Sequence, residues 1–216
     1  MVRDLQRQIA AGLEALHQQV PAGAIDRLLS LVTELERWNR RINLTAIRDV
    51  GRMVSGHLLD SLAVRPYLRG PRVLDIGTGA GFPGLPLAIT EPAIDFVLLD
   101  SNGKKISFVQ HAIATLGLTN VKGVKARAED YAPDNPFDTV IARALASLPR
   151  LLELSSHLVG EDGRLLALKG QYPAAELESI EALPGWQYSV TELKVPGLEA
   201  HARHLVCLQR KFSEAR

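Results

Sequence analysis

The chain has 216 residues, of which 46% are hydrophobic, and this is enough to form the core of one α/β domain with an appendage. Lysine and arginine number 25 against 24 acidic residues, so overall charge gives no basis for a nucleic-acid partner, and an RNA-binding surface would have to be local. The one cysteine, Cys207, lies in an apolar run, which excludes a disulfide within the chain and argues against a cysteine-based zinc site.

Residues 1–70 have the sequence pattern of helices. Apolar residues recur at helical spacing from Ile25 to Trp38 and again from Met53 to Leu62, and proline and glycine residues separate the repeats. We therefore predict an N-terminal helical extension over residues 1–70 that packs on a second domain, residues 71–216.

From residue 72 onward, short apolar runs alternate with helical patterns, which is typical of a parallel sheet with helices on both faces. The last two runs follow one another without a helix between them, so we expect an antiparallel C-terminal hairpin on an otherwise parallel, seven-stranded sheet. The predicted strands are residues 72–76, 95–100, 121–127, 137–143, 164–169, 186–195 and 201–211.

The end of the first predicted strand runs into a glycine-rich turn within residues 73–84. Glycines there allow positive φ angles and let backbone N–H groups approach a ligand closely. The Gly-x-Gly-x-x-Gly spacing that begins at Gly79 also matches a dinucleotide fingerprint, so NAD is one candidate. Asp75, two residues before Gly77, places a carboxylate in the strand that suits an α-amino group better than a pyrophosphate. We therefore favour S-adenosylmethionine over NAD, and a purely structural turn is the further alternative.

A second acidic residue, Asp100, ends the next predicted strand about twenty residues later. A carboxylate at this position can accept hydrogen bonds from both ribose hydroxyls of an adenosine. The alternative is an ordinary turn or N-cap residue. Together with the glycine turn, Asp100 supports a nucleoside-containing cofactor.

Several short motifs occur in a characteristic order and spacing, and they cover nearly the whole chain. The motifs are Trp38-Asn39, Asn43-Leu44-Thr45, His57 with Asp60-Ser61, Gly81-Phe82-Pro83-Gly84-Leu85-Pro86, Leu99-Asp100-Ser101, Arg127-Ala128-Glu129, Ala142-Arg143-Ala144, Leu168-Lys169-Gly170 and Arg203-His204-Leu205. By these motifs the sequence resembles the bacterial small-subunit ribosomal RNA guanine-N7 methyltransferases, the RsmG or glucose-inhibited division protein B family. Ala142 stands where relatives often have serine.

The resemblance implies a class I, Rossmann-like methyltransferase fold and transfer of a methyl group from S-adenosylmethionine to N7 of one guanine in a decoding-region loop of 16S ribosomal RNA. The expected partner is 16S ribosomal RNA or a precursor of the small ribosomal subunit. The resemblance also implies cofactor contacts at Gly77, Phe82, Ala128, Glu129 and Arg143, to which the glycine turn and the second strand add Asp75, Gly79 and Asp100.

Guanine N7 carries an in-plane lone pair, so methylation there needs alignment and charge stabilisation but no general base. Arg143 and Lys169 follow the fourth and fifth predicted strands and are our candidate catalytic residues. Arg143 would orient the methionine carboxylate or bind guanine O6, and Lys169 would bind O6 or a nearby phosphate. Ordinary strand-end cations are the alternative for both.

Two further features have both a structural and a functional interpretation. Arginines are dense between residues 37 and 52 and would either contact RNA phosphates or form a solvated face, while Trp38 among them fits the core better than a stacking platform. His57 and Asp60 are three apart on a predicted helix, a spacing that favours pairing with each other. A structural polar contact with the sheet domain and a substrate role are the two interpretations of these residues.

Two rival functions are an NAD-dependent oxidoreductase and an RNA-binding ribosome-assembly factor that keeps the cofactor pocket with little turnover. No segment has the length of a membrane span, and the N-terminus is amphipathic, unlike a signal peptide. We therefore expect a monomeric cytoplasmic protein with no bound metal.

Overall fold

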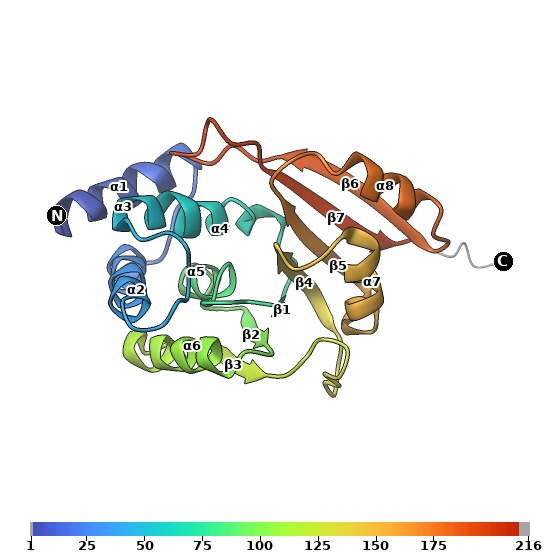
Figure 1. Cartoon of the computed structure of the whole chain (residues 1–216), viewed down its shortest axis with the longest axis horizontal. Coiled ribbons are helices and arrows are strands. Elements are labelled where there is room, and N and C mark those ends of the chain that lie inside the picture. The colour runs from blue at the N-terminus through green and yellow to red at the C-terminus, as the bar shows by residue number, and fades with distance from the viewer. Residues whose placement is uncertain (1, 212–216) are drawn as a thin grey trace.

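The computed structural model describes residues 2–211 and contains one seven-stranded sheet in the order β3-β2-β1-β4-β5-β7-β6 (Figure 1). Strand β7 runs antiparallel to both of its neighbours, and the other adjacent pairs are parallel. This confirms the predicted mostly parallel sheet with a C-terminal antiparallel hairpin. The strands are β1 Arg72–Ile76, β2 Asp95–Asp100, β3 Val121–Lys125, β4 Phe137–Arg143, β5 Val159–Lys169, β6 Trp186–Glu192 and β7 His204–Arg210.

Helices cover both faces of the sheet. Those that precede the sheet in the chain are α1 Val2–Ala15, α2 Ala24–Asn39, α3 Val50–Met53, a π-helical segment Val54–Leu59, α4 Asp60–Leu62 and a 3₁₀ turn Arg65–Tyr67. Those between the strands are α5 Gly84–Thr90, α6 Gly103–Leu116, α7 Leu148–Ser155, a 3₁₀ turn Ser156–Leu158 and α8 Ala174–Glu181.

Alternate side chains of each central strand enter two different hydrophobic clusters, as the two-residue period of a strand requires. In β1, Val73 packs with α1, α2, α5 and α6 on one face. Its neighbours Leu74 and Ile76 pack with α7 and α8 on the other face. The N-terminal helices thus share one continuous core with the sheet, which fixes their position over the carboxyl ends of the strands.

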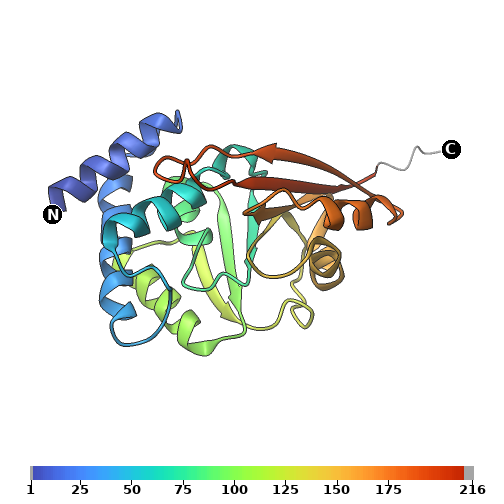
Figure 2. The same cartoon turned by 45° about the horizontal axis from the view of Figure 1, so that its top comes forward.

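The loop between β6 and β7 reaches back to the N-terminal helices (Figure 2). The Gly197 backbone packs against the side chain of Ser55 in the π-helical segment. The two predicted last strands therefore end earlier and begin later than expected, because residues 193–203 form this connection, which contains Pro196 and Gly197.

In residues 2–211, no helix combines the length and the apolar character needed to cross a membrane. The same residues contain no group of three or more histidine, cysteine, aspartate or glutamate side chains placed to hold a metal ion.

Candidate active site

Two adjoining cavities lie at the carboxyl ends of the strands, where β1 and β4 are neighbours and their helices leave to opposite faces. This is the position at which open α/β sheets bind ligands. The Arg143 cavity has a volume of about 490 Å³ and the Asp100 cavity about 620 Å³, and they share Gly77, Lys105 and Ala144. The Arg143 cavity is also lined by Leu44, Thr45, Gly56, His57, Asp60, Thr78, Gly79, Ala80, Phe82, Leu168, Lys169, Gly170 and Arg203. The Asp100 cavity is also lined by Leu99, Ser101, Asn102, Ala126, Arg127, Ala128, Glu129, Leu145, Ala146, Arg150 and Leu154.

Asp75 holds the glycine turn together from beneath. Its Oδ2 accepts hydrogen bonds from the Thr78 hydroxyl at 2.6 Å and from the Gly84 N–H at 2.8 Å. The side chain is fully buried and lines neither cavity, and burial raises the pKa of Asp75 to about 6. Its Oδ1 is buried without a hydrogen-bond partner among the described residues. Asp75 therefore shapes the turn, and its contact with a cofactor amino group stays a prediction.

Asp100 stands where the two cavities meet and is 8% exposed. Its Oδ2 accepts the Gly79 N–H at 2.9 Å, and its Oδ1 accepts the Asn102 N–H at 2.8 Å. Each carboxylate oxygen has a further lone pair available, because a carboxylate offers about four acceptor sites. The carboxylate therefore links the glycine turn to the start of α6 and can still accept ribose hydroxyls.

The other predicted cofactor positions divide between the cavities as expected for a ligand that spans both. Ala128 and Glu129 line the Asp100 cavity, and Glu129 lies 3.7 Å from the Arg127 guanidinium. Phe82 lines the Arg143 cavity, and Gly77 belongs to both. The sheet thus gathers eight of the nine predicted site residues around the two cavities, and Asp75 lies directly below them.

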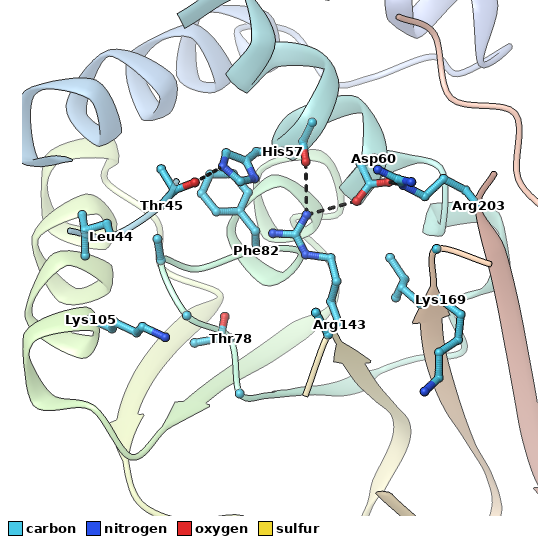
Figure 3. Close-up of a pocket in the computed structure, with 17 residues that line it drawn as sticks. Leu44, Thr45, His57, Asp60, Thr78, Phe82, Lys105, Arg143, Lys169 and Arg203 are labelled. Atoms are coloured by element: carbon cyan, nitrogen blue, oxygen red, sulfur yellow. Dashed lines mark hydrogen bonds and ion pairs between the residues drawn. The ribbon is translucent and has the colours of Figure 1, made fainter. Parts of the chain in front are cut away.

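Arg143 is held by the N-terminal helices (Figure 3). Its Nη1 donates to Asp60 Oδ2 at 3.1 Å and to the Gly56 carbonyl at 3.3 Å. The other oxygen of Asp60 accepts from Arg203 Nε at 2.9 Å. Asp60 is 5% exposed, so one buried carboxylate ties the end of β4 to the residue before β7. For Asp60 the sequence left a polar contact with the sheet domain and a substrate role open, and the structure shows the polar contact. No role for Arg203 in the site was predicted from the sequence.

His57 does not pair with Asp60, and this sequence-based expectation was wrong. Its Nε2 shares a 2.8 Å hydrogen bond with the Thr45 hydroxyl, and its ring stacks on Phe82 at a centroid distance of 4.9 Å. The segment around it is π-helical, so the neighbour relations of an α-helix do not apply. Burial, assisted by the nearby positive charge of Arg143, lowers the pKa of His57 to about 4. The imidazole is therefore neutral at pH 7.

Lys169 lines the Arg143 cavity, but its ammonium is directed away from the Arg143 guanidinium (Figure 3). The ammonium donates to the Ala146 carbonyl at 2.9 Å and to Glu176 Oε2 at 2.8 Å. Glu176 also accepts the Leu148 N–H at the start of α7. A contact between Lys169 and guanine stays a prediction, and it requires the ammonium to leave Glu176.

The arginine-rich segment is partly neutralised by its own helix. Arg37 pairs with Glu34 at 3.1 Å, and Arg40 pairs with Glu36 one turn away. Trp38 packs edge-on against Phe108, which confirms that this tryptophan belongs to the core. An RNA contact by the exposed arginines stays a prediction.

The neutral state of His57 predicts a specific acid sensitivity. The folded pKa is lower than the value of 6.5 for an unperturbed histidine, so the unfolded state binds more protons between pH 6.5 and about pH 4. Stability contributed by neutral His57 is therefore lost as the pH falls through this window, by about 3 kcal/mol in total. Asp75 acts in the opposite direction over part of the same range, because its folded pKa is raised.

The variant His57→Phe isolates the histidine, because it leaves the contribution of Asp75 in place. Urea unfolding at pH 7 and at pH 4.5 should show that wild type loses about 2 to 3 kcal/mol more than the variant on acidification. The exposed His201→Phe is the matched control and should titrate like wild type. An equal loss for wild type and His57→Phe would contradict a buried neutral imidazole.

Asp100→Ala should weaken S-adenosylhomocysteine binding by about 1.5 to 3 kcal/mol, because it removes the charged acceptor for two ribose hydroxyls. Isothermal titration calorimetry measures the affinity, and circular dichroism checks that the variant is folded. Asp95→Ala, at the exposed opposite end of β2, is the control and should bind like wild type. Unchanged affinity in a folded Asp100→Ala protein would refute the ribose assignment.

Comparison with known proteins agrees with the fold and the site. The sequence model of a family described as rRNA small subunit methyltransferase G matches residues 24–206. The chain belongs to this family. The chain is 45% identical over 210 residues to Ribosomal RNA small subunit methyltransferase G of Idiomarina loihiensis, covering 96% of this chain and 100% of that protein. It is 51% identical to the protein of that name from Aeromonas salmonicida, covering 83% and 86%.

The fold is that of class I methyltransferases. A putative O-methyltransferase from Klebsiella pneumoniae superposes with a TM-score of 0.60 at 13% identity, covering 93% of this chain and 94% of that one. As a methyltransferase of this fold, the protein takes its methyl group from S-adenosylmethionine. The family match leaves the NAD-dependent oxidoreductase without support, although the glycine spacing allowed it.

The residues present suit this cofactor. Gly79 has φ +62°, and a side chain at this position would point between the Gly77 carbonyl oxygen and the Lys105 ammonium, each 4.0 Å from the position of its Cβ. A glycine is therefore needed both for the backbone conformation and to leave this space open. The carboxylate of Asp100 stands next to the same space for the ribose.

Proposed function

We propose that the protein methylates N7 of one guanine in 16S ribosomal RNA, with the RNA or a small-subunit precursor as its partner. The observation that carries the proposal is the state of the two groups in the Arg143 cavity that resemble general bases. Asp60 is engaged by two arginines, and His57 is neutral with its Nε2 bonded to Thr45. Asp60 is occupied by these two ion pairs, and a pKa of about 4 makes His57 a weak base near neutral pH. Neither group is therefore suited to take a proton from a nucleophile, and guanine N7 has no proton to lose.

The cofactor supplies a methyl group on a positively charged sulfur. In the transfer, the N7 lone pair forms a bond to the methyl carbon while the carbon–sulfur bond breaks and its electron pair returns to sulfur. The positive charge passes to the purine, and no proton moves. The protein must therefore align the purine and exclude water, which is a positioning task.

Most of the predicted site residues receive a role in this proposal. Asp100 binds the ribose hydroxyls, while the backbones of Gly77 and Gly79 face the methionine part. Ala128 and Glu129 border the adenine. Arg143 faces the guanine in the Arg143 cavity, where Asp60 and the Gly56 carbonyl hold its guanidinium.

Methyl transfer from tritiated S-adenosylmethionine tests the proposal. Purified protein should label 16S ribosomal RNA, either free or in a small-subunit precursor, and should leave large-subunit RNA unlabelled. Binding of 16S RNA without incorporation of tritium would instead support a ribosome-assembly factor with a vestigial cofactor pocket.

Lys169→Ala should lower the single-turnover methylation rate more than it lowers cofactor affinity, because the proposed contact is with guanine O6 or a phosphate. Rapid-quench measurement under saturating RNA gives the rate. Glu176→Ala is the matched control, since it frees the Lys169 ammonium and removes the same ion pair. If both variants lose activity equally, Lys169 acts only by fixing α7 and α8, and its catalytic assignment fails.

A further inference from the structure

Four cations line the Arg143 cavity, and three of them are hydrogen-bonded to a nearby carboxylate. Arg143 and Arg203 share Asp60, and Lys169 pairs with Glu176. The fourth, Lys105, lies 3.9 Å from Asp100 Oδ2, beyond normal hydrogen-bond distance. That oxygen already accepts the Gly79 N–H. Among the described cations of this cavity, Lys105 is therefore the one whose charged group forms no hydrogen bond to a carboxylate.

Lys105 lies between the two cavities, where the methionine part of a bound S-adenosylmethionine would lie. It lines both cavities, and Figure 3 shows its ammonium directed toward the turn that contains Thr78. The Lys105 ammonium and the Gly77 carbonyl oxygen are each 4.0 Å from the position that a Cβ of Gly79 would take. A cation and a neutral acceptor that border the same position complement a carboxylate and an ammonium carried on the same carbon.

We propose that Lys105 binds the α-carboxylate of the cofactor's methionine part, an inference that rests on the proposed function. The methionine carboxylate is the only anionic group of S-adenosylmethionine. A charge-assisted hydrogen bond from the Lys105 ammonium is a strong contact for it, and Nη1 of Arg143 is already engaged by Asp60 and the Gly56 carbonyl. This assignment also decides between the two roles open to Arg143, which is left to face the guanine.

The position of Lys105 in α6 relates its contact with the carboxylate to the ribose contact of Asp100. Lys105 is the third residue of α6, which begins directly after the Asp100 turn, so ribose and carboxylate would be held by neighbouring points of one rigid element. The side chain is about one-third exposed, so water screens its charge incompletely. Removal of the positive charge should therefore lower the affinity for ligands that have the carboxylate and leave the affinity for other ligands unchanged.

Calorimetry with two ligands tests this proposal without reference to catalysis. S-adenosylhomocysteine contains adenine, ribose, thioether and the amino-acid group, whereas 5′-methylthioadenosine lacks the amino-acid group. Lys105→Met should weaken S-adenosylhomocysteine on the order of tenfold or more. It should change 5′-methylthioadenosine by less than about twofold. Lys105→Arg should recover most of the affinity, and Lys104→Met, on the adjacent exposed lysine, should bind both ligands like wild type.

Each other outcome overturns the assignment. Equal weakening of both ligands would mean that Lys105 acts on the ribose through Asp100. Unchanged binding of both ligands, with weaker binding of 16S RNA, would make Lys105 a phosphate contact. If wild type itself fails to bind S-adenosylhomocysteine, the proposed function fails first, and this inference fails with it.

Discussion

Arg143→Ala should reduce methyl transfer to 16S ribosomal RNA by about a hundredfold or more at saturating cofactor, the size of effect seen when one preorganised donor is removed from an active site. The guanidinium is fixed before substrate arrives, because Asp60 and the Gly56 carbonyl hold Nη1, and its Cζ lies over the Phe82 ring at 5.9 Å from the ring centroid. Affinity for S-adenosylhomocysteine should fall as well, because Arg143 lines the cavity next to the cofactor. The loss should be several-fold only, because the guanidinium is bonded to Asp60 and Gly56 of the N-terminal helices.

Single-turnover methylation and calorimetry together measure these two effects. Arg143→Lys should recover little of the rate, because an ammonium cannot reproduce the planar donor geometry. Arg7→Ala is the control, since this exposed arginine pairs with Asp4 and lines neither cavity. A variant Arg143→Ala that methylates at the wild-type rate would remove Arg143 from the mechanism.

Asp60→Ala should lower the free energy of unfolding by about 3 kcal/mol, because breaking a buried ion pair leaves the remaining charges without compensation. Here two guanidinium groups would face each other across the vacated position, and they are 21% and 26% exposed. Methylation should fall with it, since Arg143 loses its support. Urea unfolding measures the stability.

The surface pair Arg150–Glu153 provides the matched control for Asp60. Glu153→Ala should cost less than about 1 kcal/mol, as exposed ion pairs do. In the background Arg203→Met, Asp60→Ala should cost less than in wild type, because only one guanidinium is then left unpaired. Independent, additive losses would show that Asp60 does not couple the two arginines.

The fold was predictable where burial makes a strand continuously apolar. Strands β1, β2 and β4 begin and end at the expected residues. Strand β5 begins at Val159, whereas the sequence predicted a start at Arg164. The prediction missed the first residues because Gly160 to Gly163 are glycine and acidic residues, which are typical of turns and give no strand signal. The pairing of β4 with β5 is irregular at this point, so local sequence alone does not define the register.

The site was predictable where its residues follow strands, and it was not predictable where distant elements meet. Gly77 directly follows β1, and Asp100 and Arg143 end β2 and β4, so the parallel arrangement of these three neighbouring strands brings the residues together. The contact between Asp60 and Arg203 joins residues 143 positions apart, and no local pattern indicates it. The π-helical segment that turns His57 toward Thr45 gave no signal either, since helical periodicity assumes 3.6 residues per turn.

The atom that receives the methyl group tests the central claim most directly. After methyl transfer, 16S ribosomal RNA is reduced with sodium borohydride and treated with aniline, which cleaves the chain at N7-methylguanine. The account predicts one new cleavage, at a single guanine in a loop of the decoding region, in proportion to the tritium incorporated. Tritium incorporated without any cleavage would place the methyl group on another atom and would contradict the account.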